Sequence, residues 1–175
     1  MYVKTCLYAA LMIGLLAGGT AAAKEGVKLS PQNTKIEWVG TKPGGQHVGS
    51  FGQFSGSFDV ASGKLTVEIQ TPSLTSDNNN LTNHLKSPDF FNVRKYPKAT
   101  FTATRLEAKG DGEWTHAVTG DLTLLGKKKT ISFPAKVEGK SLTSKFTIDR
   151  THFGMNYGQG KVDNAVTITV QVNAQ

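Results

Sequence analysis

The feature that most constrains the fold is a period-two alternation of apolar and polar residues, which begins after Lys24 and recurs along the chain. In KLTVEIQT, residues 64–71, the apolar Leu65, Val67 and Ile69 alternate with polar residues. Successive side chains of a β-strand point to opposite faces, so this alternation predicts strands with one buried and one wet face. By the same criterion we expect eight strands, over residues 35–40, 50–60, 64–71, 98–106, 114–124, 129–137, 142–149 and 163–173.

Short turn signals separate most of these strands. They are Ala61-Ser62-Gly63, Gly110-Asp111-Gly112, Gly126-Lys127 and Gly139-Lys140. Eight antiparallel strands joined by short turns fit either a closed up-and-down barrel or a sandwich. A closed barrel removes both sheet edges and can hold one small ligand. The residues therefore predict an all-β domain and leave barrel and sandwich open.

One segment, between the third and fourth expected strands, breaks the alternation. Either Asp77 or Asn78 is suited to cap a short helix that carries Leu81 and Leu85 on its apolar side. Pro88 would end that helix. A connection this long inside a compact domain usually has a function, such as a lid or a plug. A lid over a cavity would also cap one end of a barrel.

Residues 1–23 have the anatomy of a secretory signal peptide. Lys4 precedes a short apolar run, and Ala21 and Ala23 form a small-residue cleavage motif. The run is about 12 residues long, whereas a bilayer-spanning helix needs about 20. We therefore expect cleavage after Ala23, a mature domain over residues 24–175, and location in the periplasm or secretion from the cell.

No pattern predicts catalysis or metal binding. The histidines are scattered, and none shows the HExxH or HxH spacing of a metal site. The single cysteine lies in the leader, which excludes a disulfide scaffold and a cysteine-cluster zinc site. No two carboxylates are paired at a defined spacing. We therefore expect no catalytic residues, no metal and no cofactor.

The chain carries a formal net charge of +7, which permits an anionic partner without identifying one. Only three of its basic residues are arginines, and the expected export signal places the chain outside the cytoplasm. Both observations weigh against nucleic acid as the partner.

Specific motifs occur in the central segment and near both ends of the domain. The most specific are HLKSPDFFN at 84–92 and YPKATF at 96–101. Weaker ones are GSF at 49–51 with Phe54, Gly56 and Phe58, PSLT at 72–75, GDLTL at 120–124 with Gly126, and RTHFG at 150–154. With these motifs, residues 28–173 resemble the YceI-like family of bacterial periplasmic, polyisoprenoid-binding proteins.

The sequence departs from the family pattern in two places. The family commonly has Arg-Asp three and two residues before its His-Leu, and this chain has Leu81 and Thr82 there. We therefore expect the lid to be held by apolar packing. The stretch Gly40–Val48 reads as a compact, Gly-rich connection rather than a longer strand. Both departures lie near the expected mouth of the cavity.

The resemblance implies an eight-stranded antiparallel, lipocalin-like barrel with a short helical lid segment and an apolar tunnel. The tunnel would hold a polyisoprenoid or other long-chain lipid, such as a polyprenyl phosphate or an isoprenoid quinone. The expected lining residues are Phe54, Phe58, Val67, Ile69, Leu85, Phe90, Phe91, Phe101, Leu122, Phe133, Phe146, Phe153, Ile168 and Val170. For each of them a filled core is the alternative.

A head group at the mouth would meet cationic side chains near the lid. The expected contacts are Arg94, Lys95, Arg150 and His152, although a structural pair between Arg150 and Asp89 is favoured for that arginine. The implied function is non-enzymatic binding, storage or transport of a long-chain amphiphile, with transient membrane contact and either a monomer or a homodimer. The alternatives are a periplasmic enzyme acting on a lipid or small amphiphile, and a partner-binding module.

Overall fold

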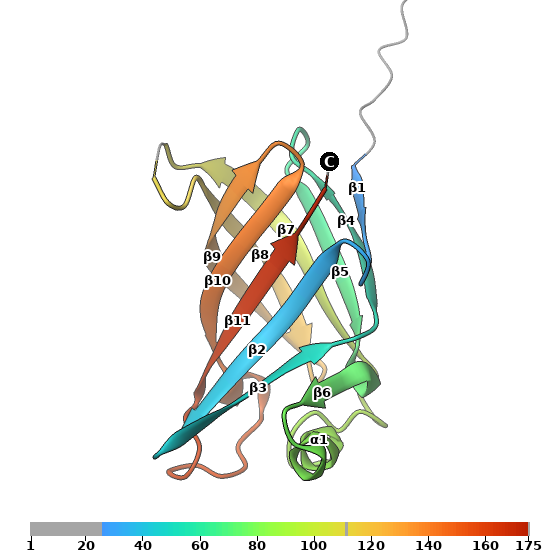
Figure 1. The fold of residues 1–175 in the computed structure, drawn as a ribbon, viewed down its shortest axis with the longest axis vertical. Coiled ribbons are helices and arrows are strands. Elements are labelled where there is room, and N and C mark those ends of the chain that lie inside the picture. Colours follow the sequence, from blue (N-terminus) through green and yellow to red (C-terminus); the bar gives the residue numbers. More distant parts are fainter. Residues whose placement is uncertain (1–25, 111, 175) are drawn as a thin grey trace, which may run out of the picture.

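The computed structural model describes residues 26–110 and 112–174, which form one antiparallel sheet of eleven strands curled into a barrel (Figure 1). The expected fold class, an all-β antiparallel barrel with a short helix, is confirmed. In spatial order the strands are β1 (Val27–Leu29), β4 (Phe54–Asp59), β5 (Lys64–Gln70), β7 (Lys98–Ala108), β8 (His116–Leu124), β9 (Lys127–Glu138), β10 (Ser141–Asp149), β11 (Ala165–Val172), β2 (Thr34–Lys42), β3 (Gly45–Phe51) and β6 (Leu74–Ser76).

The strand count is higher than the expected eight for two local reasons. β1 and β6 are three residues long, too short for an alternating pattern to be read. The single strand expected at 50–60 is divided, because the chain leaves β3 after Phe51 and enters β4 at Phe54. The remaining expected strands correspond to observed ones with shifted ends.

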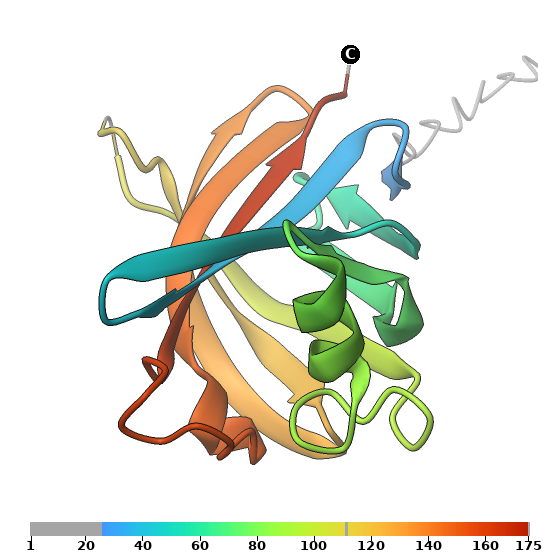
Figure 2. The same cartoon turned by 60° about the horizontal axis from the view of Figure 1, so that its bottom comes forward.

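The compact connection expected at Gly40–Val48 is wrong. These residues extend β2 and β3 into a long hairpin, in which Val39 pairs with Val48 and Lys42 with Gly45. Gly44 has a φ of 77°, a conformation that glycine adopts without steric cost, so it makes the tight turn. The hairpin projects from the barrel rim (Figure 2). Most of the turn-proximal half of β3 is exposed, so no alternation is visible there.

The main core fills the end of the barrel near the C-terminus. Its buried members are Leu29, Phe58, Leu65, Val118, Phe133, Ala135, Leu142 and Val172. They come from β1, β4 and β5 and, across the barrel, from β8 to β11. The curled sheet thus brings β1, at one end of its hydrogen-bonding order, into one cluster with β8 to β11, and this apolar burial helps to hold the barrel shape.

The opposite end is covered by the helix α1 (Asn79–Lys86), the turns that follow it, and the loop after β10 (Figure 2). Asn78 is the cap, because its side chain accepts a 3.0 Å hydrogen bond from the Leu81 backbone N–H. Asp77 instead contacts His47, with 3.0 Å between Oδ1 and Nδ1. Leu85 is the buried residue of the helix, and the chain leaves the helix at Ser87, before Pro88. The expected helical lid is therefore present.

Two short 3-10 turns complete the fold, η1 (Thr71–Ser73) before β6 and η2 (Arg150–Phe153) after β10. Within residues 26–110 and 112–174, no helix has the length and apolar character that crossing a membrane requires. The expected signal peptide at 1–23 lies outside the described residues.

Candidate functional site

An apolar cavity of about 330 Å³ lies inside the barrel, under the lid, and several residues of the main core line it. Its wall is formed by inward-facing side chains of β2, β5 and β7 to β11, by α1, and by the loop after β10. The volume lies at the lower end of the range for small-molecule sites, about 300–1,000 Å³. The barrel is therefore a container rather than a completely filled core.

Most of the residues expected to line a tunnel do line this cavity. They are Val67, Ile69, Leu85, Phe90, Phe91, Phe101, Leu122, Phe133, Phe146, Ile168 and Val170. Three aromatic rings form a row on this wall: Phe133 stacks on Phe146 with 4.2 Å between centroids, and Phe101 lies 5.4 Å from Phe133. That these residues contact a ligand stays a prediction.

Three expected lining residues, Phe54, Phe58 and Phe153, are buried but do not reach the cavity. Phe58 is 1% exposed and belongs to the main core. Phe153, the last residue of η2, packs with Ala99 and Met155. Phe54 and Phe58 pair in register with Ile69 and Leu65, which do line the cavity, so alternation identifies the inward face of a strand but not which of its side chains reach the cavity.

The cavity wall also contains residues that were not expected there. On β2, Ile36 and Trp38 line it, and their shared face was visible in the sequence as alternation. Met155 and Tyr157 come from the irregular loop after β10, where no periodic signal existed. Further members are Leu29, Phe51, Leu65, Leu81, Leu124, Ile131, Leu142, Ile148, Val162, Val166 and Val172.

Three of the four expected head-group contacts, Arg94, Lys95 and His152, do not line the cavity. All three are exposed. The Lys95 ammonium lies 5.2 Å from the ring centroid of Tyr96. His152 Nε2 lies 3.9 Å from Asp149 Oδ2. Proximity to the lid in sequence did not establish on which side of it a side chain points.

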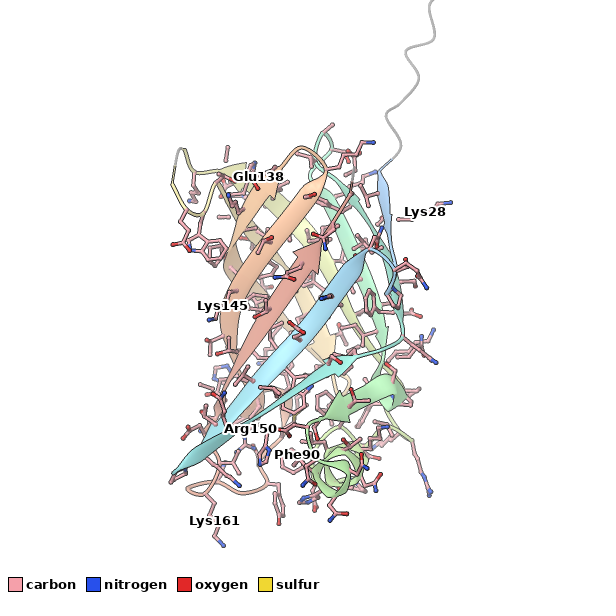
Figure 3. The ribbon with its side chains drawn as sticks, in the orientation of Figure 1. Lys28, Phe90, Glu138, Lys145, Arg150 and Lys161 are labelled. Carbon is pink, nitrogen blue, oxygen red and sulfur yellow. The ribbon has the colours of Figure 1, made fainter. Side chains whose placement is uncertain are left out.

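Arg150 lies toward the lid end of the barrel (Figure 3). It does reach the wall, and it is only 3% exposed. Its guanidinium donates to the carbonyls of Asp163 (3.0 Å), Met155 (2.5 Å), Tyr157 (2.8 Å) and Val162 (3.1 Å), and to Asn164 Oδ1 (3.5 Å). These five bonds use all five N–H donors of an arginine side chain. Arg150 therefore stabilises the folded conformation of the loop of residues 154–164.

The expected pairing of Arg150 with Asp89 is wrong. Asp89 lies beyond the lid helix and contacts His84, with 3.0 Å between Oδ2 and Nε2. Burial lowers the pKa of the Arg150 guanidinium, and the neighbouring Asp149 carboxylate acts in the opposite direction. The positive charge of Arg150 is therefore stabilised by the dipoles of the backbone carbonyls that the loop after β10 directs toward it, and not by Asp89.

The mouth of the cavity is bordered by contacts among the lid, the loop and the β2–β3 hairpin. The ring of Tyr157 lies 4.8 Å from that of His84 and 5.3 Å from that of Phe90. On the other side of the loop, Thr41 donates a 2.6 Å hydrogen bond to Asp163, whose backbone N–H donates to the Thr41 carbonyl. Three segments far apart in sequence thus meet over one opening.

The described part of the chain offers no group of three or more His, Cys, Asp or Glu side chains placed to hold a metal ion. Two histidines of the wall, His47 and His84, each contact an aspartate, as described above. The only side-chain polar atom in the described residues that is buried without a hydrogen-bond partner is Nε1 of Trp38.

A family model, that of the YceI-like domain, matches residues 28–174, which is the whole barrel. The chain belongs to the YceI-like family. Among curated relatives, a UPF0312 protein of Pseudomonas putida is 36% identical over 142 residues, covering 76% of this chain and 73% of the relative. Protein YceI of Escherichia coli is 35% identical over 147 residues, covering 76% and 70%.

Solved structures of the YceI-like fold agree with the barrel. BcnA of Burkholderia cenocepacia matches with a TM-score of 0.72 and 25% identity, covering 84% of this chain and 99% of BcnA. The YceI protein of Campylobacter jejuni matches with a TM-score of 0.57 and 28% identity, covering 73% and 84%. A domain from Saccharophagus degradans, with a TM-score of 0.58 and 14% identity over 81% and 94%, shows the shared fold.

The lid of this YceI-like chain is held where its sequence departs from the family pattern. Leu81 lines the cavity and packs against the cluster of Trp38, Leu74, Leu85 and Phe90. The Thr82 hydroxyl accepts a 2.9 Å hydrogen bond from the backbone N–H of Ser76 on β6. Apolar packing therefore holds the helix over the cavity, as expected, and one hydroxyl ties it to the neighbouring strand.

Proposed function

We propose that this YceI-like chain binds a long-chain amphiphile, in particular a polyisoprenoid lipid, inside its barrel and stores or carries it without altering it chemically. The observation that carries the proposal is the apolar cavity under a lid, lined by aliphatic and aromatic side chains. The neighbour from Saccharophagus degradans is described as a polyisoprenoid-binding domain, which supports the same ligand class.

Apolar burial alone is sufficient to bind such a tail. Each CH₂ group that leaves water contributes about 0.8 kcal/mol, so a tail of about ten carbons gains about 8 kcal/mol. A binding free energy of that size corresponds to about micromolar affinity, before the loss of ligand freedom is subtracted. Longer chains gain more as far as the wall extends.

The contacts of the two histidines in the wall support binding rather than catalysis. His47 and His84 each contact a carboxylate at the rim. A general base must reach the proton that it removes, and a nucleophile needs such a base beside it. Within the described residues, the side-chain hydrogen-bond partner of each of these histidines is an aspartate and not a Ser, Thr or Cys nucleophile, so the enzymatic alternative has no supporting observation.

The proposal places the protein in the periplasm or outside the cell, because residues 1–23 read as a signal peptide. Transient contact with a membrane would allow the lipid to enter at the lid end. N-terminal analysis of exported protein tests the location, and the mature chain should begin at Lys24.

Titration with farnesol, an isoprenoid alcohol, tests the binding site. Ile168 on β11 lines the cavity, and the adjacent Thr169 lies on the opposite face between Lys145 and Glu37. The substitution Ile168→Trp should place a bulky ring in the cavity and weaken binding, whereas Thr169→Trp should bind as the wild type does. Overpacking destabilises by about 1–3 kcal/mol, so both variants are first shown to be folded by circular dichroism. Equal binding by both variants, or no binding by the wild type, would reject the proposal.

A further inference from the structure

The end of the barrel that carries the lid, here called the mouth end, has cationic side chains on each of its three segments. Lys42 stands at the end of β2 in the projecting hairpin, and Lys161 extends away from the barrel on the loop after β10 (Figure 3). Lys86 is the last residue of α1, and Arg94 and Lys95 lie in the turns that follow it. Within the described part of the chain, none of these five side chains forms an ion pair.

The carboxylates of the mouth end do not neutralise these cations. Each of them contacts a histidine or accepts a hydrogen bond from a threonine, and they are Asp77, Asp89, Asp149 and Asp163. Two further lysines have carboxylate partners of their own, because Lys128 pairs with Asp121 and Lys98 with Glu68. The cations without an ion pair outnumber the remaining carboxylates, so the mouth end keeps a net positive charge.

Exposed apolar side chains gather at the same end. Among the described residues, the large apolar side chains that are exposed are Val48, at 43%, and Tyr157, at 49%. Val48 lies on the β2–β3 hairpin, and Tyr157 lies on the loop after β10, where it also borders the cavity. Tyrosine is enriched where a membrane meets water, because its ring is apolar and its hydroxyl polar. Binding to a bilayer surface strengthens with buried apolar area and with attraction to anionic lipids, and the mouth end offers both.

We propose that the mouth end docks on the surface of an anionic phospholipid bilayer, with Lys42 and Lys161 against the lipid phosphates and the opening of the cavity toward the membrane. The inference rests on the proposed function, because docking in this orientation serves to exchange a lipid between bilayer and cavity. A bilayer fits better than a soluble acidic protein, since the cations and the exposed apolar side chains border the opening of an apolar cavity. A lipid tail that moved directly between the two would stay out of water.

Sedimentation with vesicles tests the docking. The purified protein is mixed with vesicles of phosphatidylglycerol and phosphatidylcholine, and separately with vesicles of phosphatidylcholine alone. It should sediment with the anionic vesicles and remain in solution with the zwitterionic ones. Raising the salt concentration should release it, because salt screens exposed charges.

Two double variants with the same change in net charge locate the docking face. Lys42→Gln with Lys161→Gln should weaken binding to the anionic vesicles at least about tenfold, since each lysine near such a surface contributes about 1 kcal/mol and 1.4 kcal/mol is tenfold. Lys28→Gln with Lys109→Gln removes two exposed lysines at the opposite end of the barrel, where Figure 3 shows Lys28, and should bind as the wild type does. All four side chains are exposed, so folding should be unaffected.

A dye attached at either end of the barrel gives the orientation as a second readout. Gln46→Cys places a cysteine near the tip of the β2–β3 hairpin, and Ala61→Cys places one in the turn between β4 and β5 at the opposite end, both at exposed positions. The native Cys6 lies in the segment expected to be removed on export. A nitrobenzoxadiazole label should brighten and shift to the blue on anionic vesicles when it is carried by Gln46→Cys, and not when it is carried by Ala61→Cys.

The outcomes separate the docking from the proposed function. Equal losses in the two double variants, equal binding to zwitterionic vesicles, or a dye response at Ala61→Cys would overturn the docking. Farnesol titration without vesicles decides the proposed function on its own. A wild type that binds farnesol and ignores anionic vesicles keeps its cavity and loses the docking face, whereas a wild type that does not bind farnesol overturns both. Salt-sensitive binding that falls only in the Lys42→Gln, Lys161→Gln variant would support the docking.

Discussion

At the residue scale, the same side-chain types form the core and the cavity wall, and the neighbours that each side chain contacts decide its role. Phe58 and Phe90 are both phenylalanines with under a tenth of their surface exposed. Phe58 belongs to the main core, and Phe90 belongs to the lid and touches the cavity. The two positions therefore form a natural matched pair.

Truncating each of them should separate stability from ligand retention. Both Phe58→Ala and Phe90→Ala should lower the free energy of unfolding by about 3–5 kcal/mol. Only Phe90→Ala should also speed lipid release, because it opens the cover. Release is measured by transfer of a bound fluorescent fatty acid to acceptor vesicles, at a temperature where both variants are folded. Equal release rates would mean that Phe90 is ordinary core.

Arg150 shows a second residue-scale effect, a buried charge that supports a loop. Arg150→Met should lower the free energy of unfolding by about 3 kcal/mol or more, because several carbonyls lose a charged donor at once. Arg105→Met, which removes an exposed arginine paired with Glu107, should change it by less than about 0.5 kcal/mol. Urea denaturation measures both, and similar losses in the two variants would contradict the role assigned to Arg150.

At the element scale, η2 and the loop after it depend on an aspartate cap. The hydrogen bonds from the Thr151 hydroxyl (2.6 Å) and backbone N–H (2.8 Å) lower the pKa of Asp149. A carboxyl whose folded pKa is lowered stabilises the fold above its unfolded value of about 3.9, and that stabilisation is lost as the pH falls through the folded pKa.

The cap therefore predicts a pH dependence. The wild type should be more stable than Asp149→Asn at pH 6, and the difference should shrink as the pH falls below about 4. Denaturation curves between pH 6 and pH 2 measure it, and the other carboxylates are common to both proteins and cancel. A difference that stayed constant down to pH 2 would show that Asp149 acts without its charge.

The contact between the lid and the loop is the second element-scale feature. The Tyr157 ring touches both His84 and Phe90 of the lid segment while remaining 49% exposed. Tyr157→Ala should accelerate ligand release about two- to tenfold, since an aromatic contact contributes about 0.5–1.5 kcal/mol, and Tyr157→Phe should not. Val48→Ala, at the other large exposed apolar residue, is the control. Release from Tyr157→Ala at the wild-type rate would show that the contact does not close the mouth.

At the scale of the whole molecule, the sequence predicts the inward faces of the strands better than it predicts the site. Alternation identified β5, β10 and β11, because each has one face toward the interior. It missed the β2–β3 hairpin. The projecting end of this hairpin buries few side chains, so its sequence shows no alternation of apolar and polar residues.

The lid and the mouth depend on contacts that local sequence does not encode. The cap at Asn78 and the apolar Leu85 were readable, because capping and helical spacing are local. The five hydrogen-bond acceptors of Arg150 belong to a loop whose sequence has no periodic pattern. No feature of the sequence predicts the conformation of this loop. For the same reason, closeness to the lid in the sequence did not identify the charged side chains that reach the cavity.

Native mass spectrometry of protein purified without added lipid tests the central claim most directly. The wild type should retain a long-chain species at one per chain, released on collisional activation. Ile168→Trp, which narrows the cavity, should carry less of it, and Thr169→Trp should retain it. A wild type that is repeatedly free of any such species, or an Ile168→Trp variant that carries it equally, would contradict a barrel that holds a lipid.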